Sequence, residues 1–261
     1  TEVAMIHDIH GSTGKTSAQQ RPFRQPHHSI SSAALVGGGQ RPMPGEITRA
    51  HGGVLFLDEL TEFSAKALNQ LREPLESGCV RIGRALYRIT WPASFQLIAA
   101  MNPCPCGYYG QEQDTCRCHP VAIQRYLAKI SGPLLDRIDI QLWIEPLSPS
   151  IMLDNTPPPN TPSLSDTRDK IQSAQSIQLN RQSCLNHQLT TQHIESFGLS
   201  NQARLVLSKS LDQKRLSMRG YSRLLALART IADLDEANSI DAAHIQEALL
   251  FRQSTPLMGL A

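Results

Sequence analysis

The feature that most constrains the fold is a short apolar run that ends in two carboxylates. Val54-Leu55-Phe56-Leu57 is followed at once by Asp58 and Glu59. Four consecutive apolar residues predict a strand buried on both faces, as in a parallel sheet. Such sheets bind their ligands at the carboxyl ends of the strands. In a nucleotide site Asp58 would hold Mg²⁺ and Glu59 would polarise the attacking water. The plainer alternative is that both residues cap the next helix.

A second short buried strand is predicted from Phe95 to Met101, and it also ends in a polar side chain. Asn102 follows this strand and precedes Pro103. An Asn in that position, beside the first strand, can orient a water against a terminal phosphate. Alternatively, Asn102 only starts a turn. Two such strand ends in one sheet support each other.

Two arginines are further candidates for phosphate recognition. Arg137 lies between a helix end and a further apolar strand, predicted from the alternation of apolar residues over 138–144. Arg219 stands at the start of the most amphipathic helical segment of the chain. A planar, permanently charged guanidinium suits phosphate, but surface arginines are common and each is weak evidence alone.

One segment resembles a phosphate-binding loop without matching its pattern. Gly11-Ser-Thr-Gly14-Lys15-Thr16 has the ending of G-x-x-x-x-G-K-[ST], but the first glycine would fall at Ile9. No apolar strand leads into it. We therefore expect an ordinary flexible loop.

Four of the six cysteines are clustered within fifteen residues. They form two close pairs, Cys104 with Cys106 and Cys116 with Cys118. Two such pairs can complete a tetrahedral thiolate site, for which zinc is the default ion. His119 is a spare ligand candidate. Free thiols and disulfides are the alternatives, although clustering in a large chain without a signal segment argues against a disulfide scaffold.

Two basic segments are candidates for nucleic-acid contact. Residues 21–28 are cationic and contain two prolines, and Arg24 lies within them. Residues 79–90 predict a hairpin around a Gly-Arg turn. Its Arg81, Arg84 and Arg88 could follow a phosphate backbone. Alternatively, these arginines only keep a sheet edge soluble.

Composition limits the function classes. With 40% apolar residues the chain of 261 residues can form a core, and no apolar run reaches the length of a spanning helix. A net charge of +2 means that any nucleic-acid contact depends on local patches. We expect an α/β core over 1–148, a Pro-rich linker over 149–165 and a helical domain over 166–261. The start at Thr1 leads us to expect a fragment of a longer cytoplasmic protein.

Together these residues resemble the AAA+ ATPases of the helix-2-insert group, specifically the magnesium-chelatase-like family and its branch that contains competence proteins. The similarity covers essentially the whole chain. It is most specific in six stretches, at residues 21–28, 37–47, 54–60, 71–78, 101–107 and 132–139.

The resemblance implies an AAA+ α/β core with a parallel sheet, followed by a small all-helical lid. It also implies residue roles: Asp58 and Glu59 as the Walker B pair, Asn102 as sensor 1, Arg137 as an arginine finger for a neighbouring subunit, and Arg219 as sensor 2. Residues 21–45 would be the helix-2 insert and 79–92 the hairpin before sensor 1, both facing DNA.

The implied function is a hexameric ring motor that uses ATP and Mg²⁺ on single-stranded or branched DNA. Within the competence branch this would be a branch-migration helicase that helps integrate imported strands during natural transformation. Family members also carry an upstream phosphate loop and a Lon-protease-like domain, so we expect this chain alone to be inactive. One alternative is a chelatase-type subunit that remodels a protein partner. Another is a zinc-stabilised binding module with an incomplete nucleotide site.

Overall fold

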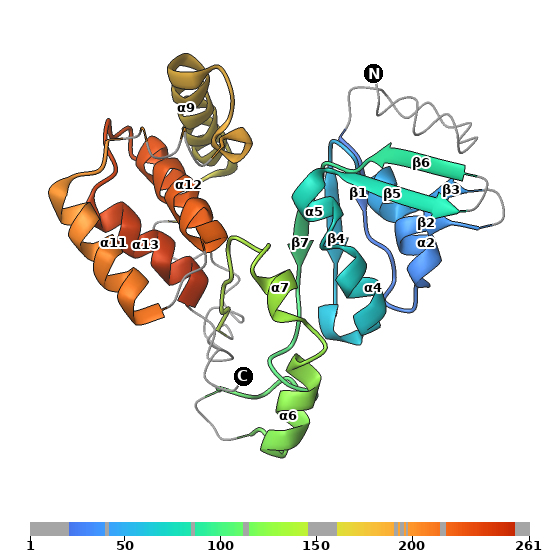
Figure 1. Cartoon of the computed structure of the whole chain (residues 1–261). Coiled ribbons are helices and arrows are strands. Elements are labelled where there is room, and N and C mark those ends of the chain that lie inside the picture. Colours follow the sequence, from blue (N-terminus) through green and yellow to red (C-terminus); the bar gives the residue numbers. More distant parts are fainter. Residues whose placement is uncertain are drawn as a thin grey trace. The chain divides into compact units, whose positions relative to one another are not determined.

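The computed structural model describes residues 21–39, 42–84, 87–111, 115–145, 161–190, 193, 196, 198–214 and 218–253. The chain divides into two compact units, with the boundary between Ile138 and Asp139 (Figure 1). The motif at 11–16 and residues 146–160 of the linker region lie outside the described residues. None of the described helices is both long and apolar enough to cross a bilayer.

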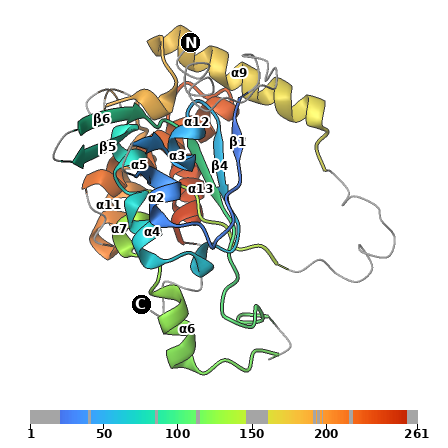
Figure 2. The ribbon, with the colours of Figure 1, turned by 90° about the vertical axis from the view of Figure 1, so that its right-hand side faces the viewer.

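A three-stranded parallel sheet forms the centre of the first unit, as predicted. The strands are β1 (Phe23–Arg24), β4 (Val54–Leu57) and β7 (Gln96–Ala99), in the order β1-β4-β7. Figures 1 and 2 show β1 and β4 side by side. Leu55 and Leu57 are fully buried, whereas Val54 and Phe56 are only half-buried. The prediction that both faces of β4 are buried is therefore wrong for the second face, because alternate side chains point to opposite faces of the sheet.

A glycine lets β1 approach β4. The Val54 N–H donates to the Pro22 carbonyl at 2.8 Å. A Cβ atom on Gly53 would lie 1.9 Å from that carbonyl oxygen, which is an impossible contact. Any side chain at position 53 would therefore push β1 away from the sheet.

A small hairpin is inserted between two short helices. Strands β2 (Gly37–Gly38) and β3 (Met43–Pro44) pair antiparallel between α2 (Ser32–Val36) and α3 (Glu46–Arg49). The hairpin lies within the expected insert over residues 21–45. Residues 23–24 of that range belong to the main sheet, because they pair in parallel with β4.

The predicted basic hairpin is confirmed, but its turn lies elsewhere. Strands β5 (Cys79–Arg84) and β6 (Tyr87–Pro92) pair antiparallel. Gly83 and Arg84 pair with Arg88 and Tyr87, so they are strand residues and not the turn. Val80 packs into the core of the first unit, and Ile82 and Trp91 on the same face pack against that core.

The first unit also contains several short helices. These are η1 (Leu60–Glu62), α4 (Ala65–Gln70), α5 (Pro74–Ser77), α6 (Pro120–Leu127) and α7 (Gly132–Leu135). Ser64 caps α4 by accepting from the Ala67 N–H at 3.2 Å. The largest buried side chains of this core include Phe63, Leu68 and Leu71.

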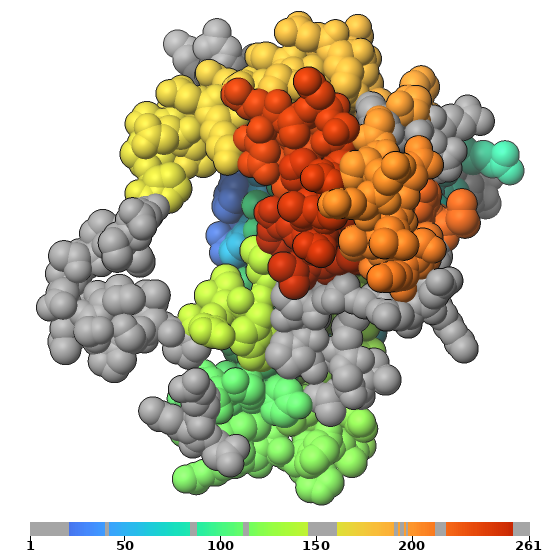
Figure 3. All heavy atoms as spheres, turned by 90° about the vertical axis from the view of Figure 1, so that its left-hand side faces the viewer, coloured from blue at the N-terminus to red at the C-terminus, as the bar shows by residue number. Residues whose placement is uncertain are grey.

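The second unit is helical, as predicted. It contains α9 (Leu164–Gln182), η2 (Asn186–Gln188), α11 (Asn201–Lys214), α12 (Met218–Leu234) and α13 (Ala242–Gln253). Figure 3 shows the atoms of these helices in yellow, orange and red. Asp241, the predicted cap residue, directly precedes α13; its Oδ1 accepts from the Ala242 N–H at 2.7 Å, and its own N–H donates to His244 Nδ1 at 2.9 Å. The helix α9 begins at Leu164, so the last two residues of the predicted linker are helical.

The apolar strand predicted over 138–144 does not form within the described residues. Residues 138–145 have no strand partner there. Ile144 is 85% exposed and Leu142 is 60% exposed. The Gln141 N–H donates to the Phe251 carbonyl at the end of α13 instead.

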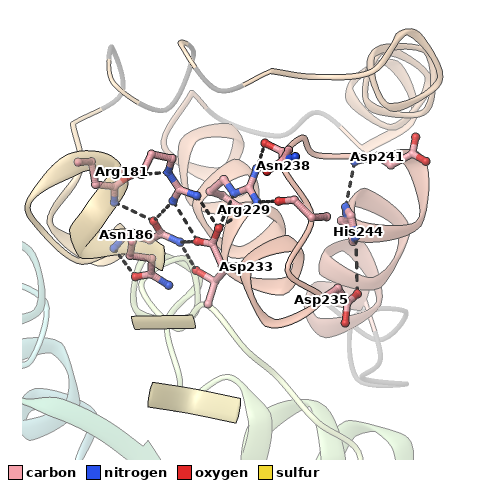
Figure 4. A network of polar contacts seen from close by, with 12 residues as sticks. Arg181, Asn186, Arg229, Asp233, Asp235, Asn238, Asp241 and His244 are labelled. Atoms are coloured by element: carbon pink, nitrogen blue, oxygen red, sulfur yellow. Dashed lines mark hydrogen bonds and ion pairs between the residues drawn. The ribbon is translucent and has the colours of Figure 1, made fainter. Parts of the chain in front are cut away.

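A buried network of charged groups ties α9 and η2 to α12 (Figure 4). Asp233 accepts from Arg229 Nε at 3.0 Å, from Arg181 Nη2 at 3.0 Å and from Asn186 Nδ2 at 2.8 Å. Burial raises the pKa of Asp233, but the hydrogen bonds from Arg181 and Asn186 and the charge of Arg229 lower it more. The net pKa is below the usual range, so the carboxylate is stabilised in its charged form.

Candidate functional site

The predicted carboxylates lie at one edge of the parallel sheet. Asp58 and Glu59 directly follow β4, and both are exposed. The Ala100 N–H donates to the Leu57 carbonyl, and the Leu60 N–H donates to the Ala100 carbonyl, each at 2.9 Å. Asp58 and Glu59 therefore bulge outward between two hydrogen bonds that join the ends of β4 and β7.

Glu59 has a left-handed backbone, with φ 51° and ψ 49°. A residue with a Cβ atom avoids this region, at a cost of about 1 kcal/mol. Two local bonds hold the turn: Asp58 Oδ1 accepts from the Glu59 N–H at 2.9 Å, and the Glu62 N–H donates to the Glu59 carbonyl at 2.7 Å. Non-glycine residues held in this conformation concentrate at functional sites, which supports a role for Glu59.

His28 contacts this edge, and the sequence analysis gave it no role there. Its Nδ1 lies 2.9 Å from Glu59 Oε2. The ring also lies 4.1 Å from the His27 ring and meets Phe63 edge-on at 6.5 Å, both measured between centroids. The direction of β1 explains this position of His28. Because β1 runs parallel to β4, residues shortly after β1 reach the same edge of the sheet as Glu59.

Asn102 follows β7 by three residues and is exposed. Because β7 pairs in parallel with β4, Asn102 leaves the sheet at the same edge as Asp58 and Glu59. Asp58, Glu59 and Asn102 are thus brought to one edge.

Arg137 lies inside its own unit. Its side chain is 8% exposed, forms an ion pair with Glu76 and donates to the Pro133 carbonyl. It also lines a cavity of about 540 Å³ together with Arg72 and Arg81. A guanidinium that reaches a neighbouring subunit must first leave Glu76.

Arg219 is the second residue of α12 and is exposed. It belongs to the second unit, and the structure describes it only within that unit.

The predicted DNA-contacting arginines have different surroundings. Arg24 forms an ion pair with Glu46 at 2.7 Å, and Glu46 also pairs with Arg49. Arg81 is exposed and lies 3.2 Å from Glu73. Arg88 is exposed and pairs with Gly83 in the hairpin.

The pairing register of β5 with β6 determines on which face of the hairpin Arg81 and Arg88 lie. Arg81 and Arg88 belong to the set that alternates with Val80 and Ile82, so they face away from the core. Arg84 lies in β5, but its side chain is outside the described residues.

The four clustered cysteines converge in space. Their Sγ atoms all lie within 4.8 Å of one another, and all four are free thiols. Cys104 Sγ is 3.3 Å from Cys106 Sγ and 3.7 Å from Cys116 Sγ. His119 is engaged elsewhere, because its Nδ1 accepts from the Val121 N–H at the start of α6.

The cysteines differ in acidity without a metal. The Tyr108 N–H donates a hydrogen bond that lowers the pKa of Cys106 to about 6. The Cys118 thiol donates to Cys106, which raises the pKa of Cys118 to about 12. The cluster thus combines one thiol of lowered pKa with one of raised pKa.

Comparison with known proteins shows matches over both units. Residues 1–152 match the family model described as magnesium chelatase, subunit ChlI, and residues 162–252 match the model of the ChlI C-terminal region.

Three relatives are similar over most of this chain. The uncharacterized protein YifB of Escherichia coli K12 is 46% identical over 90% of the chain, and the competence protein ComM of Haemophilus influenzae is 46% identical over 92%. The uncharacterized protein Rv2897c of Mycobacterium tuberculosis is 39% identical over 97%. These matches cover 46%, 47% and 51% of the relatives, so the chain spans about half the length of the curated relatives that it matches.

Proposed function

This chain belongs to the family of the magnesium chelatase subunit ChlI, and from that premise we propose that it is part of an ATP-hydrolysing AAA+ motor. The observation that carries the proposal is the shared edge of β4 and β7, where Asp58 and Glu59 follow one strand and Asn102 lies three residues beyond the other. The parallel sheet and helical second unit are compatible with an AAA+ core and lid.

The residues of this edge suit a magnesium–nucleotide substrate. Mg²⁺ prefers oxygen ligands and is usually bound by one or two carboxylates and the substrate phosphates. Asp58 is the proposed carboxylate for that ion. Glu59 is the proposed base that orients and deprotonates the attacking water, and Asn102 would hold that water against the terminal phosphate.

We propose DNA as the polymer on which the motor acts, in branch migration during natural transformation. Arg81 and Arg88 support this proposal, because both are exposed on the face of the β5–β6 hairpin opposite to the core. Guanidinium groups on one exposed face suit a phosphate backbone. The similarity to a protein named competence protein points in the same direction.

A second candidate function is the remodelling of a protein partner, as a chelatase-type subunit. The description of the matching family model favours it. In either case we propose a homo-hexameric ring, in which Arg137 and Arg219 contribute to nucleotide sites.

The experiment that tests the function is ATP hydrolysis by the whole protein that carries this chain, with and without single-stranded and branched DNA. The catalytic control is Glu59→Gln, which should bind ATP but lose turnover. We expect DNA to stimulate hydrolysis, and Arg81→Ala with Arg88→Ala to remove most of that stimulation. The matched control is Arg125→Ala, an exposed arginine on α6.

The salt dependence of DNA binding provides an independent readout. Each phosphate contact that is removed should reduce the slope of log affinity against log salt by about 1. Hydrolysis that is indifferent to DNA would favour the partner-remodelling subunit. No hydrolysis in the whole protein would leave only a binding module.

A further inference from the structure

The four-cysteine cluster lies in the chain between Asn102 of the proposed nucleotide edge and α6. Cys104 follows Asn102 by two residues, and Cys118 precedes the first residue of α6 by two. Figure 2 shows the loop that leaves β7 and leads to α6. We propose that Cys104, Cys106, Cys116 and Cys118 hold one zinc ion, and that this zinc positions Asn102 and α6 at the carboxylate edge. The positioning role rests on the proposed function, whereas zinc binding does not.

The sulfur positions fit a tetrahedral zinc ion. With Zn–S distances of about 2.3 Å, the edges of a regular S₄ tetrahedron are about 3.8 Å long. The measured Sγ–Sγ separations include 3.3 Å for Cys104–Cys106 and 3.7 Å for both Cys104–Cys116 and Cys106–Cys116. All four atoms also lie within 4.8 Å of one another. Four thiolates without nearby carboxylate ligands select zinc over magnesium or calcium.

One side of the cluster is joined to Asn102. The Gly107 N–H donates to the Cys104 carbonyl at 3.0 Å and closes a tight turn that contains Cys106. Gly107 has φ +85°, and a Cβ atom there would lie 3.9 Å from Asn102 Cγ. The turn therefore lies against the Asn102 carboxamide. An ion that fixes Cys104 and Cys106 also fixes the turn that borders this carboxamide.

The other side of the cluster is joined to α6. His119 caps this helix directly after Cys118, and Ile123 and Tyr126 bury its inner face. Burial raises the pKa of Tyr126, and the negative charges of Glu62, Cys104 and Glu59 contribute to the increase. Lys129 follows α6, and its Nζ lies 5.6 Å from the centroid of the Tyr126 ring and 3.9 Å from Glu62 Oε2. The end of α6 therefore lies beside the helical turn that follows Glu59.

Zinc in this site would act on structure and not on the reaction. Four protein ligands leave no open coordination position, as in other structural zinc sites. Its loss would release the turn beside Asn102 and the start of α6. Turnover should then fall through misplacement of Asn102, while Asp58 still binds the nucleotide.

The test compares cysteine variants of the whole protein that carries this chain. Cys106→Ser and Cys118→Ser remove one ligand each, and Cys106→His keeps a ligand that zinc accepts. Cys79→Ser and Cys184→Ser are matched controls, because neither sulfur belongs to the cluster. Three quantities are measured: zinc and iron per chain, amide hydrogen exchange over residues 101–107 and 120–127, and kcat and KM for ATP.

We expect about one zinc per chain in the wild type, both controls and Cys106→His, and less than about a tenth of that in the serine variants. Exchange over 101–107 and 120–127 should increase in the serine variants only. Their kcat should fall about tenfold or more while KM for ATP changes less than about twofold.

Each contrary outcome has one meaning. A wild type without zinc, or with iron in its place, would overturn the zinc site. Zinc that is lost from the serine variants without faster exchange beside Asn102, or without a fall in kcat, would overturn the positioning role. If the wild type hydrolyses no ATP, the proposed function fails, while zinc content and exchange still decide whether zinc orders these two segments.

Discussion

Glu59 combines two observations that single out one side chain. Its backbone is left-handed, and its carboxylate contacts His28 at 2.9 Å across two strands. Neither feature is needed to bury apolar surface, because the side chain is about half-exposed. Backbone strain together with this contact supports a functional role for the position of the Glu59 carboxylate.

A glycine substitution at position 59 separates the cost of the strained backbone from the contribution of the carboxylate to ATP hydrolysis. In Glu59→Gly the left-handed backbone no longer carries a Cβ atom, so the first unit should become more stable by about 0.5–1 kcal/mol. ATP hydrolysis should fall by about 100-fold or more through loss of the base. Urea unfolding followed by Trp91 fluorescence, in a Trp143→Phe background, measures the stability.

The control for this prediction is Glu62→Gly, three residues further along the same turn. Glu62 lies within the helical turn η1, where glycine should cost about 0.5–1 kcal/mol. A loss of stability in both variants would show that Glu59 carries no backbone strain.

Residue types at strand ends could be predicted from sequence, but contacts across strands could not. Asp58, Glu59 and Asn102 each follow a recognisable apolar run, so the sequence alone places them at strand ends. The partner of Glu59 is a different matter. The contact of His28 with Glu59 can be predicted only when β1 is known to pair with β4. A strand of two residues is too short to show a hydrophobic periodicity in the sequence.

At the scale of elements, the helical unit depends on a buried ionic network as well as on apolar packing. Arg229 and Asp233 are both 1% exposed and lie one turn apart on α12. Arg181 of α9 and Asn186 of η2 complete the network (Figure 4). Charged groups buried in this way hold α9 in one orientation on α12, because any other orientation leaves a charge unpaired.

Removal of the central carboxylate should strongly destabilise the helical unit. Asp233→Asn leaves the buried Arg229 without its counter-charge, at a cost of about 3–5 kcal/mol. The matched control is Asp235→Asn, a 52%-exposed carboxylate directly after the end of α12, which should cost about 1 kcal/mol or less. Thermal unfolding of the two variants measures the difference, and similar costs would contradict a special role for Asp233.

The pH dependence follows from the lowered pKa of Asp233. The folded unit holds the proton less tightly than the unfolded chain, so the stabilisation is complete above the unfolded pKa of about 4. It is lost as the pH falls below that value through the folded pKa. The free energy of unfolding of the helical unit should therefore fall less steeply with decreasing pH in Asp233→Asn than in the wild type. The same pH dependence in both proteins would contradict a charged Asp233.

The strand predicted over 138–144 shows why an alternating apolar pattern alone is not enough to predict a strand. Apolar residues alternate there, as in a strand with one buried face. A strand also needs a neighbour for its backbone hydrogen bonds, and alternation says nothing about whether one is present. The helices were more predictable because their hydrogen bonds are internal.

At the scale of the whole molecule, the proposed ring makes Arg137 the residue that tests whether nucleotide sites are shared between subunits. It pairs with Glu76 within its own unit. If it acts on a neighbour, two inactive variants should complement each other. Glu59→Gln and Arg137→Ala should each be inactive alone, yet mixed rings contain interfaces with an intact Glu59 on one side and an intact Arg137 on the other.

Random mixing in equal amounts should make roughly a quarter of interfaces complete. Activity should therefore reappear when the two purified variants are combined under conditions that permit subunit exchange. The control is a mixture of Glu59→Gln with the double variant, which contains no intact pair. No recovery in the first mixture would place the action of Arg137 within one chain.

The two hydrogen bonds beside Glu59 have a mechanical consequence. Because Ala100 donates to Leu57 and accepts from Leu60, the tips of β4 and β7 form a rigid reference frame. In the motor that we propose, such a frame is a poor hinge. We expect displacement after the loss of a phosphate in the segments attached to the frame by single loops, which are the cysteine loop with α6 and the segment that carries His28.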